Sequence, residues 1–294
     1  MLRRFPLPPD LRARVARGVP LPPAEPVTAA TVMLVREPAI AGTGVEVWLL
    51  RRADGLPSAP GATAFPGGGL DARDADPDVP WRGAPVDGWG RRLGLPDEDA
   101  AALLCAAVRE TYEECGVLLA EVDEPRPDAA APGGVGLPPG QEDAERAALA
   151  RRELALSDLL RRRGLALRSD LLRPWARWTT PEPAERRYDT WFFLAAVPAG
   201  ARARHLGEDG HEAEAVEGGW WRPAAVLDAE AEGRVRLLPP TRVALEELAA
   251  AEDLVALLGT RRSLTEVLPR VAGLPDDPHL LAELPEHPDP VGAV

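Results

Sequence analysis

Prolines and glycines interrupt this chain too often for regular structure to run through it without breaks. Its 294 residues include 33 prolines and 27 glycines, concentrated near the start, in residues 71–96, in residues 123–140 and after residue 273. Proline removes a backbone donor and glycine weakens helices and strands, so these stretches are predicted to be loops or tails. The hydrophobic content of 45% is that of an ordinary globular protein, so the segments between them should form a packed core.

Strands and helices are predicted in the segments that remain. Residues 29–35 and 45–50 are apolar, β-branched runs separated by a loop, which is typical of a β-hairpin. Residues 188–197 are the strongest strand candidate in the second half, and residues 220–227 begin a further strand or a helix. Helical composition or periodicity covers residues 141–163 and 241–258.

The clearest helix in the sequence is expected over residues 97–115. Asp97 follows a proline and should be the N-cap, acidic residues fill the first turn, and Gly116 should end the helix. Cys105 and Cys115 lie ten residues apart on this helix. That spacing separates them by about 15 Å at the helical rise per residue, so they cannot form a disulfide. Free thiols suit a reducing compartment, and the expected location is the cytoplasm.

Composition excludes several classes of function. All 34 basic residues are arginine, so a Walker phosphate loop, a pyridoxal Schiff base and a protein kinase lack the lysine each requires. Two cysteines and four scattered histidines give no zinc-ligand spacing. A net charge of −13 disfavours nucleic acid and anionic membranes as partners, and no run of eighteen apolar residues could span a bilayer.

Three glutamates share one face of the expected helix. Glu110, Glu113 and Glu114 are three or four residues apart, whereas Leu104 and Cys115, with Val108 and Thr111, fall on the opposite face and should be buried. The glutamates repel one another and lie at the negative end of the helix dipole, so a cation should offset them. Carboxylates on adjacent turns suit Mg²⁺ or Mn²⁺, and a solvated acidic patch is the alternative interpretation.

Residues 109–117, RETYEECGV, resemble the core of the Nudix box, and Gly67-Gly68 after Phe65-Pro66 resembles its leading glycine turn. This resemblance implies an α+β fold: a Nudix-like α/β/α sandwich with a mixed β-sheet, loop insertions and a helical C-terminal segment. The implied organisation is an N-terminal extension (residues 1–28), a Nudix hydrolase domain (residues 29–240) with insertions near 71–96 and 123–140, and a C-terminal helix and tail (residues 241–294).

The chain departs from the family pattern in two places. The box places its opening glycine fourteen residues before the arginine, whereas Gly68 precedes Arg109 by 41, so 27 residues are inserted. The first glutamate of the box, eight residues before the arginine, falls on Ala101. The insertion, residues 178–195 (WTTPEPAERRYDTWFFLA) and residues 237–241 (LLPPT) are similar to coenzyme A diphosphatases that resemble nucleoside diphosphate-linked moiety X motif 19.

The resemblance implies a small-molecule nucleotide diphosphate as substrate, with Mg²⁺ or Mn²⁺ as cofactor. Coenzyme A or acyl-coenzyme A would give 3′,5′-ADP and (acyl-)phosphopantetheine. An ADP-ribose or dinucleotide (NADH) pyrophosphatase and a non-catalytic nucleotide-binding module remain alternatives, and a homodimer remains open.

The roles that the resemblance implies fall into three groups. Arg109 would orient the three glutamates, and a downstream carboxylate would complete the metal site. Trp178 or Tyr188 would stack on adenine, although packing in the core is the more ordinary role of either aromatic. The implied metal ligands are Gly67 (through its carbonyl), Glu110, Glu113, Glu114 and Glu214, with Glu217 as alternate, and the implied substrate contacts are Arg52, Gly68, Arg187 and Trp178, with Arg186 and Tyr188 as neighbours.

Overall fold

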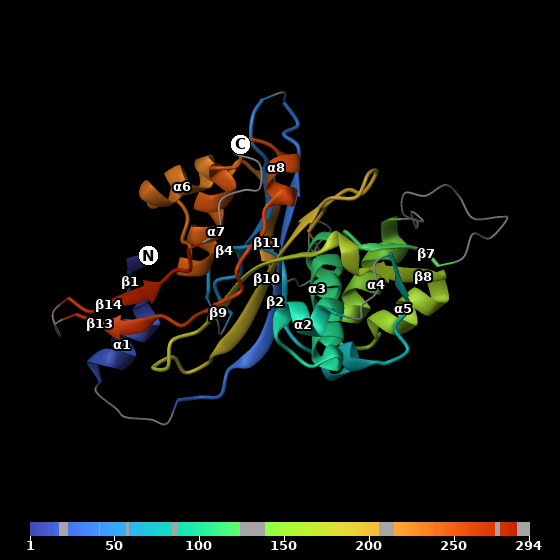
Figure 1. The fold of residues 1–294 in the computed structure, drawn as a ribbon. Helices are drawn as coiled ribbons and strands as arrows, with labels where there is room; N and C mark the ends of the chain where they lie inside the picture. The colour runs from blue at the N-terminus through green and yellow to red at the C-terminus, as the bar shows by residue number, and fades with distance from the viewer. Residues whose placement is uncertain are drawn as a thin grey trace.

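A large mixed β-sheet forms the centre of the protein (Figure 1). The computed structural model describes residues 1–17, 23–40, 42–56, 59–83, 88–123, 139–205, 215–273 and 277–286. The sheet follows the strand order β11-β3-β2-β10-β9-β12, with β4 paired to β3 and β5 paired to β2. These strands are β2 (Val27–Arg36), β3 (Glu46–Arg52), β4 (Thr63–Ala64), β5 (Gly67–Gly69), β9 (Arg173–Thr179), β10 (Tyr188–Ala196), β11 (Ala215–Trp221) and β12 (Glu266–Val267).

The pairing of the strands is mixed, as expected. Strand β2 runs parallel to β10 and antiparallel to β3 and β5. Its side chains alternate between two buried clusters, because successive residues of a strand point to opposite faces. Ala30, Val32 and Leu34 join one cluster, and Met33 and Val35 join the other. The sheet therefore separates two hydrophobic cores, one under each layer of helices.

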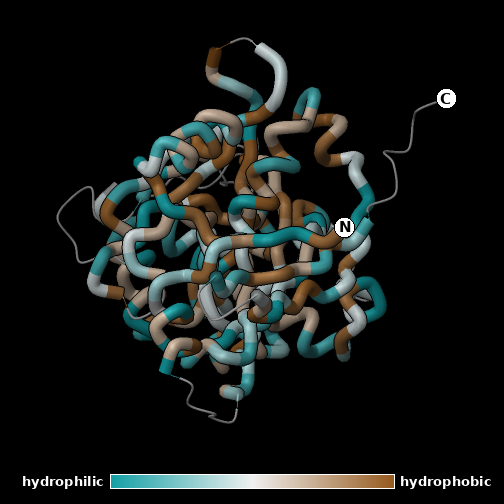
Figure 2. The backbone as a smooth tube through the Cα atoms, turned by 90° about the vertical axis from the view of Figure 1, so that its left-hand side faces the viewer, coloured by the Kyte–Doolittle hydropathy of each residue, from teal (hydrophilic) through white to brown (hydrophobic). Residues whose placement is uncertain are grey.

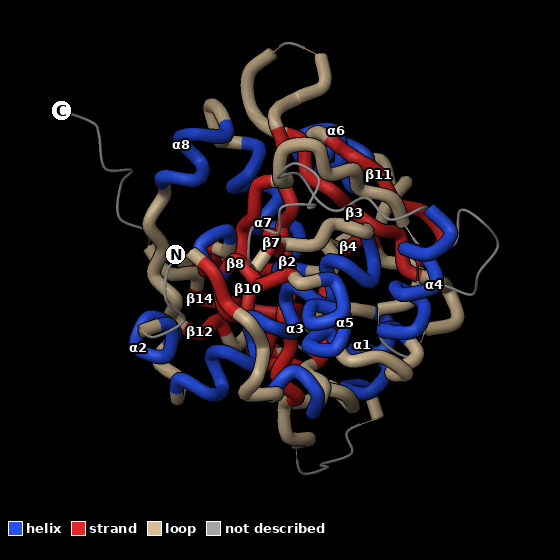
Figure 3. The backbone as a smooth tube through the Cα atoms, turned by 90° about the vertical axis from the view of Figure 1, so that its right-hand side faces the viewer, coloured by secondary structure: helices blue, strands red, loops and turns tan. Residues whose placement is uncertain are grey.

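Helices cover both faces of the sheet, which confirms the α/β/α sandwich. One face carries α2 (Trp89–Leu93), α3 (Asp97–Cys115), α4 (Pro139–Ala150) and α5 (Leu156–Arg163), with a small sheet of β6 (Trp81–Arg82), β8 (Leu165–Arg168) and β7 (Ala120–Val122). Figure 3 shows α3, α4 and α5 in front of the strands. The other face carries α6 (Pro223–Ala231), α7 (Pro239–Ala249) and α8 (Leu254–Gly259).

The two ends of the chain form regular structure where loops or tails were expected. Strand β1 (Leu2–Pro6) pairs antiparallel with β14 (His279–Glu283), which also pairs with β13 (Arg270–Ala272). Helix α1 (Pro9–Ala16) follows β1, and Figure 2 shows this N-terminal strand on the face turned to the viewer. The prediction was wrong because each short strand gains its partner from the opposite end of the sequence, which local composition does not reveal.

Other predicted elements needed smaller corrections. Residues 71–96 are not a plain loop, because they contain a 3₁₀ turn η1 (Ala72–Ala75), β6 and α2. The helical stretch 141–163 is two helices, α4 and α5, and the stretch 241–258 is likewise two, α7 and α8. Most of the second insertion, residues 124–138, lies outside the described residues. The division at residues 28 and 240 stays a prediction.

Helix α3 has the predicted limits but not the predicted N-cap. Pro96 occupies the N-cap position, and the Asp97 carboxylate instead accepts a hydrogen bond from the Gly90 backbone N–H at 3.1 Å. Gly116 ends the helix with φ of 72°, a left-handed conformation that glycine adopts without steric cost. The face opposite the glutamates is buried as expected, and Cys105 and Cys115 are both free thiols. None of the helices described is both long and apolar enough to cross a membrane.

Candidate active site

The last two turns of α3 carry the three glutamates against the glycine strand β5. The Gly67 N–H donates a hydrogen bond to Glu114 Oε2 at 2.8 Å. A Cβ added at Gly68 would lie 2.5 Å from Glu110 Oε1, so only glycine allows this close approach of backbone and carboxylate. Because β5 pairs with β2, the sheet fixes the position of the glycines relative to the helix.

Arg109 is buried at the centre of the acidic cluster, with a residue exposure of only 6%. Its Nη1 donates to Glu110 at 2.7 Å and to Glu113 at 3.2 Å, while its Nη2 donates to the Gly69 carbonyl at 3.0 Å. One guanidinium thus connects two of the glutamates to the glycine strand. These contacts are compatible with the orienting role that the resemblance implied for Arg109, which stays a prediction.

A fourth carboxylate, which the sequence interpretation missed, holds this arginine from the other side. Asp74 accepts two hydrogen bonds from Arg109, from Nε at 2.8 Å and from Nη2 at 2.9 Å. It is 3% exposed and lies on η1, where Asp71 caps the turn by accepting from the Arg73 N–H at 2.9 Å. Such a bidentate, buried pair fixes the orientation of a guanidinium more firmly than a single contact does.

The position of Asp74 can be found in the sequence when the spacing of the box is counted from its opening glycine. Measured back from Arg109, the first glutamate of the box falls on Ala101, which lies on α3 itself. Measured forward from the opening glycine, the same position is six residues beyond Gly68 and is Asp74. The inserted residues therefore follow this carboxylate, and η1 returns it to the arginine.

Among the three glutamates, Glu113 has a pKa that is shifted by its surroundings. Burial and the nearby negative charge of Glu110 together raise the pKa of Glu113 to about 7, although Arg109 acts to lower it. The protein therefore concentrates more negative charge here than Arg109 alone neutralises.

A second buried arginine neutralises the end of α3. Arg146, on α4, is completely buried, and its Nε donates to the Tyr112 carbonyl at 3.0 Å. Its Nη2 donates to the Glu113 carbonyl at 3.2 Å and to the Arg204 carbonyl at 2.8 Å. The last turn of α3 has no basic residue of its own, so Arg146 supplies the positive charge that a helix C-terminus favours.

A groove of about 880 Å³ opens beside the glutamates. It is lined on one side by the glycine strand and the acidic end of α3, and on the other by β9, β10 and the start of α7. Arg52, Trp178, Arg186 and Tyr188 all line it. Two arginines and two aromatic residues thus extend the surface available to a ligand well beyond the carboxylates.

Comparison with known proteins decides the family. The model of the NUDT19 Nudix domain matches residues 89–248, which is more than half of the chain. The chain belongs to the NUDT19 Nudix domain family. The crystal structure of a Nudix hydrolase from Alicyclobacillus acidocaldarius is 30% identical, with a TM-score of 0.62, and the match covers 81% of this chain and 97% of that one.

Two proteins named acyl-coenzyme A diphosphatase NUDT19 are also similar. The one from Gallus gallus is 29% identical over 225 residues, which are 66% of this chain and 58% of that protein. The one from Homo sapiens is 32% identical over 189 residues, which are 52% of this chain and 48% of that protein. The chain thus spans about half the length of these two relatives.

One of the expected substrate contacts is not placed in the groove. Arg187 does not line the groove: it is 8% exposed, and its guanidinium donates to the Thr180 and Ala24 carbonyls, each at 2.9 Å. The neighbouring Arg186 faces the groove instead, because successive residues near a strand point to opposite sides. Of the two arginines, Arg186 is thus the one placed to contact a ligand in the groove.

The further metal ligands implied beside the three glutamates were Glu214, with Glu217 as alternate, and the Gly67 carbonyl. Glu214 lies outside the described residues. Glu217 is exposed on β11, opposite Arg51 of β3. Gly67 meets the box through its N–H, so the carbonyl contact expected of it stays a prediction.

The three glutamates fit a hard cation, although their carboxylate oxygens are hydrogen-bonded to protein groups. Among the residues that the structure describes, no three carboxylates converge into a ready-made metal cluster. Glu110 and Glu113 are turned toward Arg109, and Glu114 is turned toward the Gly67 N–H. All three line the groove, and oxygen ligands with excess negative charge are what Mg²⁺ and Mn²⁺ require.

Proposed function

We propose that the protein is a metal-dependent Nudix hydrolase that cleaves the diphosphate of coenzyme A or acyl-coenzyme A. The observation that carries the proposal is the Nudix helix itself, on which Glu114 accepts from the glycine strand while Arg109 holds Glu110 and Glu113. Membership of the NUDT19 family and the names of the two similar proteins support the choice of substrate.

Glu110, Glu113 and Glu114 would hold the Mg²⁺ or Mn²⁺. Bound there, the metal would neutralise the diphosphate and lower the pKa of a water for attack on phosphorus. Arg109 keeps two of the carboxylates on the groove side of α3, and Asp74 keeps Arg109 in place. The glycines leave the backbone beside Glu110 uncovered, so a diphosphate can approach the carboxylates closely.

The groove supplies contacts for the rest of the substrate. Arg52 and Arg186 line it and suit phosphate oxygens, including the 3′-phosphate that coenzyme A carries on its ribose. Trp178 and Tyr188 present aromatic surface to the same groove, which suits adenine. The two free, buried thiols support a reducing compartment such as the cytoplasm. A homodimer stays a prediction.

A product analysis tests the substrate. The protein is incubated with coenzyme A, acetyl-coenzyme A, ADP-ribose and NADH, each with Mg²⁺ or Mn²⁺ and with EDTA, and the products are identified by mass spectrometry. We expect 3′,5′-ADP and 4′-phosphopantetheine from coenzyme A, and no turnover in EDTA. A tenfold preference in kcat/KM for ADP-ribose or NADH would retain the Nudix chemistry and reject the substrate. Absence of cleavage with either metal would favour a nucleotide-binding module.

A further inference from the structure

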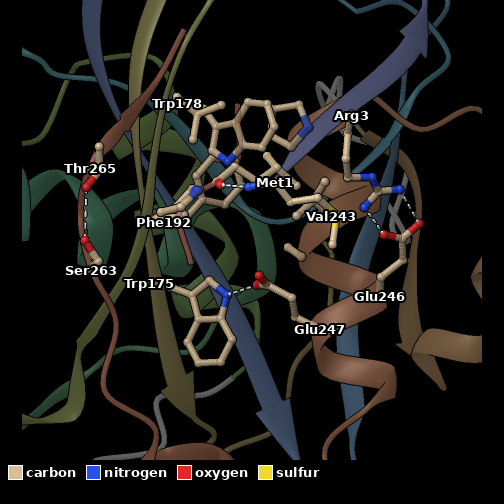
Figure 4. A pocket seen from close by; sticks show the side chains of 16 residues that line it. Met1, Arg3, Trp175, Trp178, Phe192, Val243, Glu246, Glu247, Ser263 and Thr265 are labelled. Atoms are coloured by element: carbon tan, nitrogen blue, oxygen red, sulfur yellow. Dashed lines mark hydrogen bonds and ion pairs between the residues drawn. The ribbon is translucent and has the colours of Figure 1, made fainter. Parts of the chain in front are cut away.

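A second pocket lies on the face of the large sheet that α7 covers. Its volume is about 210 Å³, and its walls come from both ends of the chain as well as from β9, β10 and α7. Figure 4 shows Trp178 and Phe192 on one side of it and Val243, from α7, on the other.

This pocket adjoins the groove that holds the Nudix glutamates. Trp178, Phe192 and Pro240 line both hollows, so the same three side chains form the boundary between them. The strand register gives the separation: Phe192 is opposite Thr31, and Thr31 is opposite Gly67. Two strand spacings therefore lie between Phe192 and the glycine strand, or about 10 Å.

The charged groups that line the pocket are already paired with protein groups. Arg3 donates to Glu246 at 3.1 Å, as Figure 4 shows. Glu247 accepts from Trp175 Nε1 at 2.7 Å and forms an ion pair with Arg262. The Met1 ammonium donates to the Leu284 carbonyl at 2.7 Å.

The remaining surface of the pocket is largely aromatic or aliphatic. Trp175, Phe192, Val243, Ala244 and Val267 contribute to it, and each is less than a tenth exposed. A phosphate placed here would find Arg3 and the Met1 ammonium already paired with protein groups. Arginine side chains also line the neighbouring groove. The chemistry therefore separates a polar groove for phosphates from an apolar pocket for an uncharged group.

We propose that this pocket receives the acyl chain of an acyl-coenzyme A whose diphosphate lies at the glutamates. The inference rests on the proposed function, because it concerns the same substrate. An adenine ring is the other candidate from that molecule, but it carries a 3′-phosphorylated ribose for which the pocket offers no uncommitted charge among its described residues.

The size of the pocket predicts a preference for chain length. Its volume corresponds to about seven groups of about 30 Å³ each, the share of one water molecule in the liquid. An acyl chain of about eight carbons, with about seven of them beyond the thioester carbonyl, would fill it. Each methylene buried there should raise kcat/KM by about fourfold, since burying a methylene is favourable, until the pocket is full.

The test compares coenzyme A thioesters of two, four, six, eight and twelve carbons with free coenzyme A. The measured quantity is the ratio of kcat/KM for the octanoyl ester to that for coenzyme A. Val243→Phe reduces the pocket, and we expect this ratio to fall at least tenfold. Val243→Ala enlarges it, and the preferred chain should become longer. The matched control is Val255→Phe on α8, because Val255 is 78% exposed and does not line the pocket.

The outcomes separate this inference from the proposed function. If the wild type cleaves coenzyme A but the ratio stays within twofold in both Val243 variants, the acyl pocket is rejected while the diphosphatase stands. If Val255→Phe alters the ratio as much as Val243→Phe, the inference also fails. If the wild type cleaves none of these compounds, the proposed function itself fails. Circular dichroism and melting curves identify a variant that has not folded, and the enlarging variant then decides.

Discussion

The two faces of the large sheet are built in opposite ways. On the α3 face, Arg109 and the three glutamates come from one short stretch of helix, and their positions relative to one another follow from helical geometry. On the α7 face, the pocket walls come from β1, β9, β10, α7 and the C-terminal segment, which are distant in sequence. The difference shows that the acidic cluster follows largely from the local sequence of α3, whereas the pocket depends on how distant segments fold together.

The largest expected effect is on the α3 face. Glu114→Gln should keep the fold, because the amide oxygen still accepts a hydrogen bond from the Gly67 N–H. It should lower kcat by at least two orders of magnitude on every substrate, as happens when a preorganised charge is lost. Steady-state kinetics with Mn²⁺ check this. Glu98→Gln, on the exposed first turn of the same helix, is the control and should change kcat less than twofold; equal losses would mean that the wrong carboxylates have been assigned.

Asp74 tests whether η1, the turn that precedes the inserted residues, contributes to the α3 face. Asp74→Asn replaces a carboxylate that receives two hydrogen bonds from Arg109 with an amide that can match only one of them. We expect kcat to fall by about tenfold, within the range known for disturbed ligand-supporting groups, and the Mn²⁺ affinity to fall with it. Asp78→Asn, an exposed residue in the insertion that follows η1, is the control. A normal Mn²⁺ affinity in Asp74→Asn would show that Asp74 only stabilises the fold.

The limits of sequence prediction follow the same division between the faces. The helix, its buried side and the positions of Glu110, Glu113 and Glu114 were predicted because spacings of three and four place residues together whatever the fold. Asp74 was missed because an insertion separates it from Arg109 by 35 residues, so that only the structure brings them together. The wall that contains β1 was not predictable, since Leu2 pairs with Glu283 at the other end of the chain.

A smaller effect is expected from the arginine that faces the groove. Arg186→Gln should raise KM by about fivefold to tenfold and leave kcat and the melting temperature nearly unchanged, because it removes a hydrogen bond from a charged group to the substrate. Arg187→Gln is the matched comparison. It should lower the melting temperature, since this buried side chain donates to two backbone carbonyls. The opposite pattern would return the substrate role to Arg187.

The smallest expected effect is a dependence of stability on pH in the protein freed of metal. The pKa of Glu113 is raised, chiefly by burial, from 4.5 to about 7. Between these two values the unfolded chain has released the proton and the folded protein retains it, so the free energy of unfolding falls as the pH rises. Above about pH 7 this loss is complete, because Glu113 is then ionised in both states. Melting temperatures measured in EDTA should therefore fall by a few degrees between pH 5 and pH 8, in addition to any general trend.

Two measurements attach this effect to the α3 face. Glu113→Gln cannot ionise at this position, so its melting temperature should vary less with pH than that of the wild type. Adding Mn²⁺ should raise the melting temperature of the wild type more at pH 8 than at pH 5, because at the lower pH a proton competes with the metal for the Glu113 carboxylate. A wild-type profile that matches that of Glu113→Gln would show that the excess negative charge at the end of α3 is already neutralised without a metal.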